Sequence, residues 1–414
     1  MAIDYRTQAL KLTPAGHSDE PTLLNNLGAA YWALFSRLGE LEHVHMALEY
    51  IARSIVLTPE GHPHKPERLN SLGAAYWRLF NRLGELKHAH MAFECMKQAE
   101  ALTPNNHPDK PSYLSNLGVA YSEMFDRLGQ LEHIRMAINY RLQAVALTPE
   151  GHPDKPILLS NLGNTYLTLF DHLGQLEHAH MGTSYLVQAV ALTPDSHPAK
   201  SRHLNNLANA YMRLFNLSFG ELEYLHLAIN CATQAVELIP EGDPSGIQRL
   251  HRLGRLYFVL FTSSLELEHV AMSKRYFRCA ALFTTGNPDD RLLAARHWVW
   301  LCTPGGSDAL EAYSHCMLCL PELVWLGTSV HRRFECLKAS DVQDLVSEAV
   351  GVAILANRYD LVVEWLEQGL CLVWSHILQL RTPLDNLRAS HPELANELYR
   401  LSTQLEDVDS RARN

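Results

Sequence analysis

Thiols and imidazoles are the side chains of this sequence that could do chemistry, and two small groups of them lie close together. His315, Cys316 and Cys319 form a C-x-x-C motif next to a histidine. A structural zinc site needs a second pair of ligands, and residues three apart on an apolar helix share one face, so we interpret these cysteines as core residues. His297 and Cys302 have no carboxylate at a helical offset that could orient a base, so we predict that they are not a catalytic pair.

Most of the 23 histidines recur at a fixed interval. Three rows stand out: His43, His88, His133, His178 and His269 at the start of one predicted helix per repeat, His45, His90, His180 and His226 two residues on, and His62, His107, His152 and His197 in the linkers before proline. One hypothesis for the first two rows is a metal-binding or pH-responsive ladder, because imidazole binds metals and titrates near neutrality. The alternative is that they are partly exposed turn residues copied by duplication, since no carboxylate or thiolate completes a ligand set. We predict no metal site, no cofactor and no catalytic residue, and therefore not an enzyme.

The elements that carry these residues belong to an internal repeat. Prolines close successive copies at Pro14, Pro59, Pro104, Pro149 and Pro194, each 45 residues after the last, and at Pro240 after 46. A fixed period of this size predicts a solenoid of stacked units. Each copy opens with an octet of the pattern L-x-x-L-G-x-x-Y: LNNLGAAY (24–31), LNSLGAAY (69–76), LSNLGVAY (114–121), LSNLGNTY (159–166), LNNLANAY (204–211) and LHRLGRLY (250–257).

The octets predict a first helix with one apolar face, because their apolar residues are three or four apart. Glycine in a helix interior costs about 1 kcal/mol relative to alanine, so its recurrence predicts close approach of a second helix. The predicted packing residues are Gly28, Tyr31, Gly73, Tyr76, Gly118, Tyr121, Gly163, Tyr166, Tyr211, Gly254 and Tyr257.

A second glycine follows each first helix and predicts its C-terminal end: Gly39, Gly84, Gly129, Gly174 and Gly220. A second apolar stripe then runs to the closing Leu-Thr-Pro, so each unit is an antiparallel helix pair. Six pairs are predicted at about 21–57, 66–102, 111–147, 156–192, 201–238 and 247–283. Helices follow at 288–301 and 307–320, and at about 321–338, 341–356, 359–380 and 384–406.

The octet spacing resembles the first helix of a tetratricopeptide repeat (TPR). From Gly28 to Ala47 is 19 residues, where a TPR has about 12, so the unit resembles a long-helix variant. The predicted fold is an all-α, right-handed TPR-like solenoid of about six pairs with an irregular helical C-terminal part. The predicted domains are a half repeat with only a second helix at 1–14, the solenoid at 15–286, a C-terminal TPR-like region at 287–408 and a tail at 409–414.

The TPR resemblance implies a ligand-binding groove lined by the first helices. Its predicted residues are Asn25, Asn70, Ser115, Ser160 and Asn205 in one row, Asn164 and Asn209 in the row one turn on, and the aromatic anchors Trp32 and Trp77 nearby. The amides and hydroxyls of these rows could bind a peptide backbone, or could only bridge neighbouring repeats. No lysine stands in the first row, so binding of chaperone C-terminal carboxylates is not expected.

The segment VEWLEQGLCLVWSHILQLRTPLDNLRASHPELANELYRLSTQLE (363–406), with the LTPEGHPDKP repeats before it, resembles the region upstream of the protease in fungal TPR–CHAT proteins. Some of these are called aromatic di-alanine and TPR-containing proteins. The resemblance implies a regulatory or sensor arm without its caspase-like CHAT domain, whose His and Cys motifs we do not find. The function predicted is a non-catalytic scaffold that binds a protein or peptide. The alternative is a truncated CHAT-family cysteine protease whose catalytic domain lies outside this chain and would act in cis with it.

Composition narrows the classes of partner. The net charge is −10, with 35 basic against 45 acidic residues, which disfavours nucleic acid because its phosphates are bound by clustered Lys and Arg. Glu364, Glu367 and His376 interrupt the longest apolar helix, so we predict no membrane span. Eight cysteines without paired spacing and no export signal predict a reducing compartment, the cytoplasm or nucleus.

Overall fold

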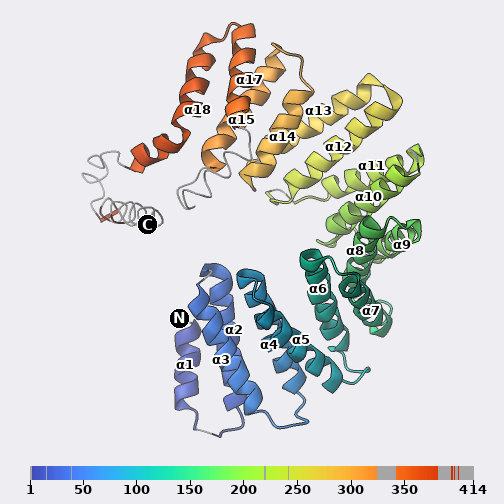
Figure 1. Cartoon of the computed structure of the whole chain (residues 1–414), viewed down its shortest axis with the longest axis vertical. Helices are drawn as coiled ribbons and strands as arrows, with labels where there is room; N and C mark the ends of the chain where they lie inside the picture. The colour runs from blue at the N-terminus through green and yellow to red at the C-terminus, as the bar shows by residue number, and fades with distance from the viewer. Residues whose placement is uncertain are drawn as a thin grey trace. The chain divides into compact units, whose positions relative to one another are not determined.

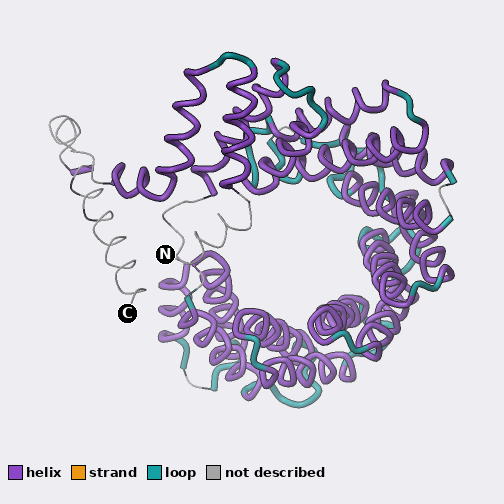
Figure 2. Tube along the Cα trace, turned by 45° about the horizontal axis from the view of Figure 1, so that its top comes forward, coloured by secondary structure: helices purple, strands orange, loops and turns teal. Residues whose placement is uncertain are grey.

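The computed structural model describes residues 2–14, 16–38, 40–218, 221–240, 242–323 and 342–380, with four isolated positions at 393, 394, 396 and 400. Within these ranges every regular element is an α-helix, and the helices follow one another through short loops (Figures 1 and 2). The chain divides into two units, Met1–Leu214 and Phe215–Asn414. The all-α prediction is therefore confirmed.

Unit 1 is a stack of antiparallel helix pairs. The helices are α1 (Ala2–Leu12), α2 (Glu20–Leu38), α3 (Leu41–Val56), α4 (Lys65–Leu83), α5 (Leu86–Leu102), α6 (Lys110–Leu128), α7 (Leu131–Leu147), α8 (Lys155–Leu173), α9 (Leu176–Leu192) and α10 (Lys200–Leu217), whose last turn passes the unit boundary. A lone helix, α1, packs against α2; four antiparallel pairs follow, from α2 with α3 to α8 with α9, and the second helices α3, α5 and α7 each pack against the next first helix. This packing confirms the predicted 45-residue helix-pair repeat.

Unit 2 continues the helix-pair pattern with less regular spacing. Its helices are α11 (Leu222–Glu237), α12 (Gly246–Ser264), α13 (Leu267–Ala281), α14 (Pro288–Trp300), α15 (Ser307–Leu323), α17 (Val342–Leu355) and α18 (Tyr359–Leu380). The helix predicted to end at 320 includes Pro321 and is described as far as Leu323. The rest of the helix predicted at 321–338, and nearly all of that at 384–406, lie outside the described residues. The domain limits at 14, 286 and 408 stay predictions.

Glycine ends three of the first helices in the left-handed conformation. Gly84, Gly129 and Gly174 have φ of 76°, 66° and 69°, and each donates its N–H to a phenylalanine carbonyl four residues earlier at 2.7 Å. This confirms the predicted helix ends at these three positions. The corresponding Gly39 and Gly220 lie outside the described residues.

The octet glycines lie where the two helices of a pair approach at backbone distance. A Cβ on Gly163 of α8 would lie 2.8 Å from the carbonyl oxygen of Gly182 on α9, and a Cβ on Gly182 would lie 2.8 Å from the Gly163 oxygen. A Cβ on Gly28 would lie 3.0 Å from the Ala47 oxygen. The octet leucines next to these glycines are buried, so closely packed apolar side chains surround the contact.

Tyrosines extend the contact within a pair. Four octet tyrosines stack on a tyrosine of the second helix with ring centroids 5.5–5.7 Å apart and interplanar angles of 16–18°: Tyr31 on Tyr50, Tyr121 on Tyr140, Tyr166 on Tyr185 and Tyr257 on Tyr276. Burial raises the pKa of Tyr31, Tyr140, Tyr166 and Tyr276. Tyr76 faces Cys95 instead, and Tyr211 is half-buried on α10.

A buried lysine joins each of three repeats to the next. Lys155, at the start of α8, donates from Nζ to the carbonyl oxygens of Val145 (2.9 Å) and Thr148 (2.8 Å) at the C-terminal end of α7. Lys110 and Lys200 make the equivalent bonds, and all three lysines are less than 10 % exposed. The last carbonyls of a helix have no partner within it and carry partial negative charge, so a cation there is stabilising.

We expect Gly163→Ala to lower the free energy of unfolding by about 1–3 kcal/mol, because a methyl would press on the Gly182 carbonyl. Gly351→Ala in α17 is the matched control, since a Cβ there meets nothing within 4 Å, and it should be stabilising by about 0.5–1 kcal/mol. Urea denaturation measures both. Stabilisation by Gly163→Ala would contradict the backbone contact.

Lys155→Met should lower the free energy of unfolding by about 1–3 kcal/mol, since two buried carbonyls lose a charged donor. Lys87→Met is the control. Lys87 is exposed and pairs only with Glu85, so its loss should change stability by less than about 0.5 kcal/mol. Equal effects of the two substitutions in thermal denaturation would show that the linker lysine is not structural.

Candidate functional site

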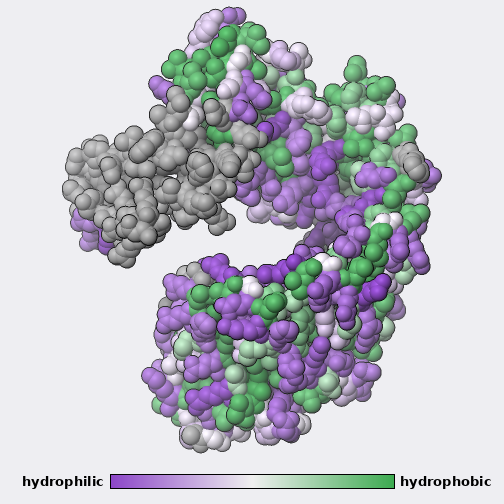
Figure 3. All heavy atoms as spheres, in the orientation of Figure 1, coloured by the Kyte–Doolittle hydropathy of each residue, from purple (hydrophilic) through white to green (hydrophobic). Residues whose placement is uncertain are grey.

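A groove crosses the first helices of three consecutive repeats in unit 1. It has a volume of about 680 Å³. We call it the first-helix groove and define it by its lining residues: Trp32, Phe35 and Ser36 on α2, Ala74, Trp77, Arg78, Asn81 and Arg82 on α4, Met96 on α5, and Asn116, Val119 and Glu123 on α6. Hydrophilic and hydrophobic residues are interspersed over the visible face of the unit 1 repeats (Figure 3).

The two predicted aromatic anchors differ in depth. Trp32 is half-buried at one end of the groove, with its ring centroid 5.4 Å from that of Phe35. Trp77 is only 5 % exposed, packs against Phe80 in the core, and donates its Nε1–H to Glu123 of the next repeat at 2.5 Å. Trp77 therefore forms the floor of the groove, and Trp32 is the tryptophan whose ring is partly exposed in it.

Part of the predicted polar row bridges neighbouring repeats. Asn116 Nδ2 donates to Asn70 Oδ1 at 3.1 Å, and Asn206 Nδ2 donates to Ser160 Oγ at 3.2 Å. Ser160 is 2 % exposed, and its hydroxyl is engaged in this bridge between repeats. The other members of the predicted rows stand as follows: Asn25 is half-buried with Oδ1 unpartnered, Ser115 is half-buried in a pocket between linkers, and Asn205, Asn164 and Asn209 are half-buried on α10, α8 and α10.

The groove carries more positive than negative charge. The Arg78 guanidinium lies 5.1 Å from the Trp32 ring centroid, a cation–π contact, and neither Arg78 nor Arg82 forms an ion pair within the described ranges. Glu123 is the one acidic lining residue, and its carboxylate already accepts from Trp77 and from Asn81 Nδ2 at 2.8 Å. The groove can therefore take a negatively charged group beside an aromatic ring.

The histidines at the helix starts pack against the octet tyrosines. Their ring centroids lie 6.2–6.5 Å apart in five repeats: Tyr31 and His43, Tyr76 and His88, Tyr121 and His133, Tyr166 and His178, and Tyr257 and His269. His88 is 8 % exposed, and burial lowers its pKa. Over the part of the chain that the structure describes, no group of three or more His, Cys, Asp or Glu side chains is placed to hold a metal ion.

The cysteines singled out in the sequence lie in the core of unit 2. Cys316 and Cys319 on α15 are 0 % and 4 % exposed. Burial raises the pKa of both thiols, that of Cys319 to about 11, and lowers the pKa of His315. Protonated buried thiols are neither nucleophiles nor metal ligands. Cys302 donates from Sγ to the Trp298 carbonyl at 3.2 Å.

His297 has a partner that the sequence did not indicate. Its Nδ1 lies 3.1 Å from Nε2 of His251 on α12, and both rings pack on Phe277. His251 stands in the first polar row one repeat beyond Asn205. The pair is therefore a bridge between first helices, comparable to that of Asn70 and Asn116.

One exposed aromatic pair in unit 2 was missed from the sequence. Trp300 at the end of α14 is 66 % exposed, and its ring centroid lies 4.8 Å from that of Phe258 on α12. Phe258 stands 46 residues after Met212, in the series that begins with Trp32 and Trp77. Extending that series into the sixth repeat would have found Phe258, whereas Trp300 lies where the repeat period fails.

No protein-family model matches the sequence, and no curated protein sequence matches it significantly. Solved structures do resemble the chain. One is a Podospora anserina protein whose TPR-like repeats are nearly identical to one another. It is 18 % identical to this chain over 52 % of this chain and 96 % of that one, with a TM-score of 0.39. A thermophilic TPR protein from Thermus thermophilus is 20 % identical over 57 % and 99 %, with a TM-score of 0.36. A human IFIT1 dimer with PPP-AAAA is 15 % identical over 86 % and 73 %, with a TM-score of 0.40.

These neighbours include TPR-repeat proteins, the repeat type that the octets resemble. Each TM-score is below 0.5, and the helix-pair repeat itself is shown by the packing within the chain. Among the described residues, no helix is long and apolar enough to cross a membrane.

The buried His203 and the half-buried His251 predict a loss of stability in acid. Burial lowers the pKa of His203 and of His251 to about 4, below the value near 6.5 of the unfolded chain. The unfolded chain therefore binds more protons between these values, so stability falls as the pH drops from about 6.5 towards 4. Each histidine should cost up to about 2 kcal/mol at about pH 5.

The variant His203→Leu, His251→Asn takes the residues that the repeat has at equivalent positions, Leu158 and Asn205. Its thermal midpoint should fall less than that of the natural chain between about pH 7 and pH 5, because two protonation sites are gone. Parallel pH curves for the two proteins would show that these histidines do not titrate below their usual range.

Proposed function

We propose that this chain is a non-catalytic protein-interaction scaffold whose first-helix groove binds an acidic segment of a partner protein. The observation that carries the proposal is the open groove in which Arg78 and Arg82 have no ion-pair partner among the described residues while Glu123 is already hydrogen-bonded. A ligand carboxylate would find charge without having to break an existing ion pair.

The aromatic and polar groups of the groove add specificity. The Trp32 ring presents a flat apolar surface next to the Arg78 guanidinium, and tryptophan and arginine are the residue types that most often dominate binding energy at interfaces. Asn116 and Ser36 line the same groove and can hydrogen-bond a peptide backbone. An extended segment with an acidic residue next to an apolar one fits this lining.

The sequence resemblance supports a more specific role. We infer that the chain is the regulatory or sensor arm of a fungal TPR–CHAT type protein, acting in the cytoplasm or nucleus. The alternative is that it is part of a CHAT-family cysteine protease whose catalytic domain acts in cis. A reading frame that continues in phase into a caspase-like domain would favour the alternative, and transcript sequencing decides between them.

Arg78→Glu, Arg82→Glu should weaken binding of acidic partner segments by roughly tenfold or more, because charge-assisted contacts become repulsive. The partner is first captured from extract with the natural chain, and its acidic segments are then titrated as labelled peptides by fluorescence anisotropy. Trp32→Ala should also weaken binding, whereas Trp77→Ala would damage the core.

Arg135→Glu is the matched control, since Arg135 is exposed on the second helix α7 and away from the groove lining. It makes the same change of charge and should leave the affinity unchanged. Equal losses in Arg135→Glu and in the groove variant would mean that only the net charge matters, and the groove proposal would be wrong.

A further inference from the structure

Two further pockets lie in unit 1 along the linkers between repeats, and Asn116 is the one lining residue that they share with the first-helix groove. One pocket, of about 570 Å³, lies between the linkers that follow α5 and α7 and includes Leu158; we call it the Leu158 pocket. The other, of about 420 Å³, lies between the linkers that follow α7 and α9 and includes His203; we call it the His203 pocket. Both pockets include His152, Asp154 and Ile157, so they adjoin and form one linker trough.

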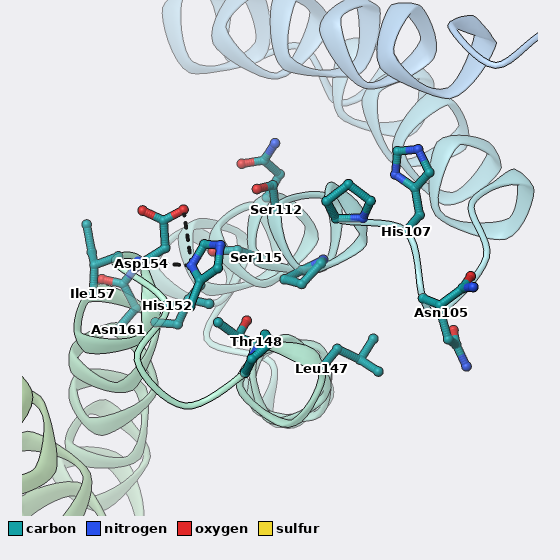
Figure 4. A pocket seen from close by; sticks show the side chains of 16 residues that line it. Asn105, His107, Ser112, Ser115, Leu147, Thr148, His152, Asp154, Ile157 and Asn161 are labelled. Atoms are coloured by element: carbon teal, nitrogen blue, oxygen red, sulfur yellow. Dashed lines mark hydrogen bonds and ion pairs between the residues drawn. The ribbon is translucent and has the colours of Figure 1, made fainter.

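Each linker contributes one histidine, and with it one imidazole N–H, to the trough. His107 and His152 reach the Leu158 pocket from its two linkers (Figure 4). The Nδ1 atoms of His107, His152 and His197 accept the backbone N–H of the residue two positions on, at 3.1–3.2 Å. An Nδ1 that accepts a hydrogen bond has no proton, so in the neutral ring Nε2 carries it and can donate to a ligand. The linker histidines are therefore donors spaced by the repeat.

The two pockets differ at one pair of positions. Ile157 and Leu158 at the start of α8 are replaced 45 residues later by Arg202 and His203 at the start of α10. Arg202 is exposed and forms no ion pair within the described part of the chain. Equivalent pockets therefore occur in successive repeats, but the residue pair that is apolar in one repeat is basic in the next.

His203 is a buried polar residue that lines this pocket. Its side chain is 1 % exposed, and its Nδ1 has no hydrogen-bond partner among the residues that the structure describes. Buried polar atoms in native proteins are nearly always hydrogen-bonded, and an exception in a pocket indicates a missing ligand or water. Arg202 lines the same pocket and has no ion pair among the described residues, whereas Lys200 nearby is paired with Asp195, so an acceptor with negative charge fits best beside Arg202.

We propose that the linker trough binds an extended peptide that places an apolar side chain in the Leu158 pocket and a carboxylate side chain in the His203 pocket. Two adjoining pockets in successive repeats suit a chain-like ligand better than a single small molecule. Arg202 pairs with the carboxylate, His203 donates to it, and the Nε2–H groups of the linker histidines donate to backbone carbonyls. The carboxylate end of the trough is distinct from the proposed groove, since no residue of the His203 pocket lines the groove and the Leu158 pocket shares only Asn116 with it.

The test uses fluorescein-labelled peptides in which Leu and Glu are separated by Gly-Ser spacers of different length, with matched peptides that carry Gln in place of Glu. The full chain is compared with Arg202→Ile, His203→Leu, which copies the pair of the preceding repeat and is therefore expected to fold. Arg135→Ile is the control for loss of one exposed charge. One spacer length should bind best, and the double variant should bind that Glu peptide roughly tenfold or more weakly, while Arg135→Ile should not.

A second measurement does not depend on the variant. An adjacent carboxylate favours the imidazolium form, so binding of the Glu peptide should raise the pKa of His203 followed by NMR, and the Gln peptide should not. Equal binding to the natural chain and the double variant, or no binding by any peptide, would overturn the proposal. Binding of free glutarate as tight as that of the best peptide would also overturn it, because the site would then take a small dicarboxylate. Groove variants should bind these peptides normally, which separates this result from the first-helix proposal.

Discussion

The contact on which the rest of the structure depends is the approach of two helix backbones at the octet glycine. Where Gly163 meets Gly182, no space remains for a side chain on either helix. This contact fixes how far apart the helices of a pair lie, and therefore places the tyrosine stacks and the buried leucines. A helix pair of this kind cannot bury both of its apolar faces alone, so neighbouring repeats must stack.

At the linkers, polar groups hold neighbouring repeats together in addition to the buried apolar area. The threonine that closes a second helix bonds its hydroxyl back into that helix, and the lysine that opens the next first helix bonds the last carbonyls. Because these contacts use only the helix ends, they leave other positions of the first helices and linkers free to vary. The same scaffold can therefore carry Ile157 and Leu158 in one repeat and Arg202 and His203 in the next.

The sequence predicted the architecture because the architecture is set by local rules. Proline spacing, octet glycines and helix-ending glycines each predict one local structure, and together they predict the helix pairs. How deeply a side chain is buried does not follow from its position in the repeat. Trp32 and Trp77 share a row, yet Trp77 is buried because Glu123 of the next repeat accepts its N–H. The burial of Lys155 could not be predicted from the sequence, since its carbonyl partners become adjacent only when the repeat folds.

The lining of the candidate site was therefore predicted only in part, since Trp32 and Trp77 are the predicted groove residues that line it. The first helices do line a groove, but two predicted polar residues, Asn70 and Ser160, are occupied in bridges between repeats. The free charge comes from Arg78 and Arg82, which single-sequence reasoning could not distinguish from ordinary solvated arginines. Only the three-dimensional neighbourhood shows which charges are paired and which are free.

Site-specific photo-crosslinking in cell extract tests the central claim most directly. A photoreactive amino acid would replace Ser36 or Val119 in the groove, and Gln98 or Gln143 on the exposed faces of second helices. The account predicts that one partner protein is crosslinked from both groove positions and from neither second-helix position. Adducts only from positions 98 and 143 would place the partner on the other face and would contradict a first-helix binding groove.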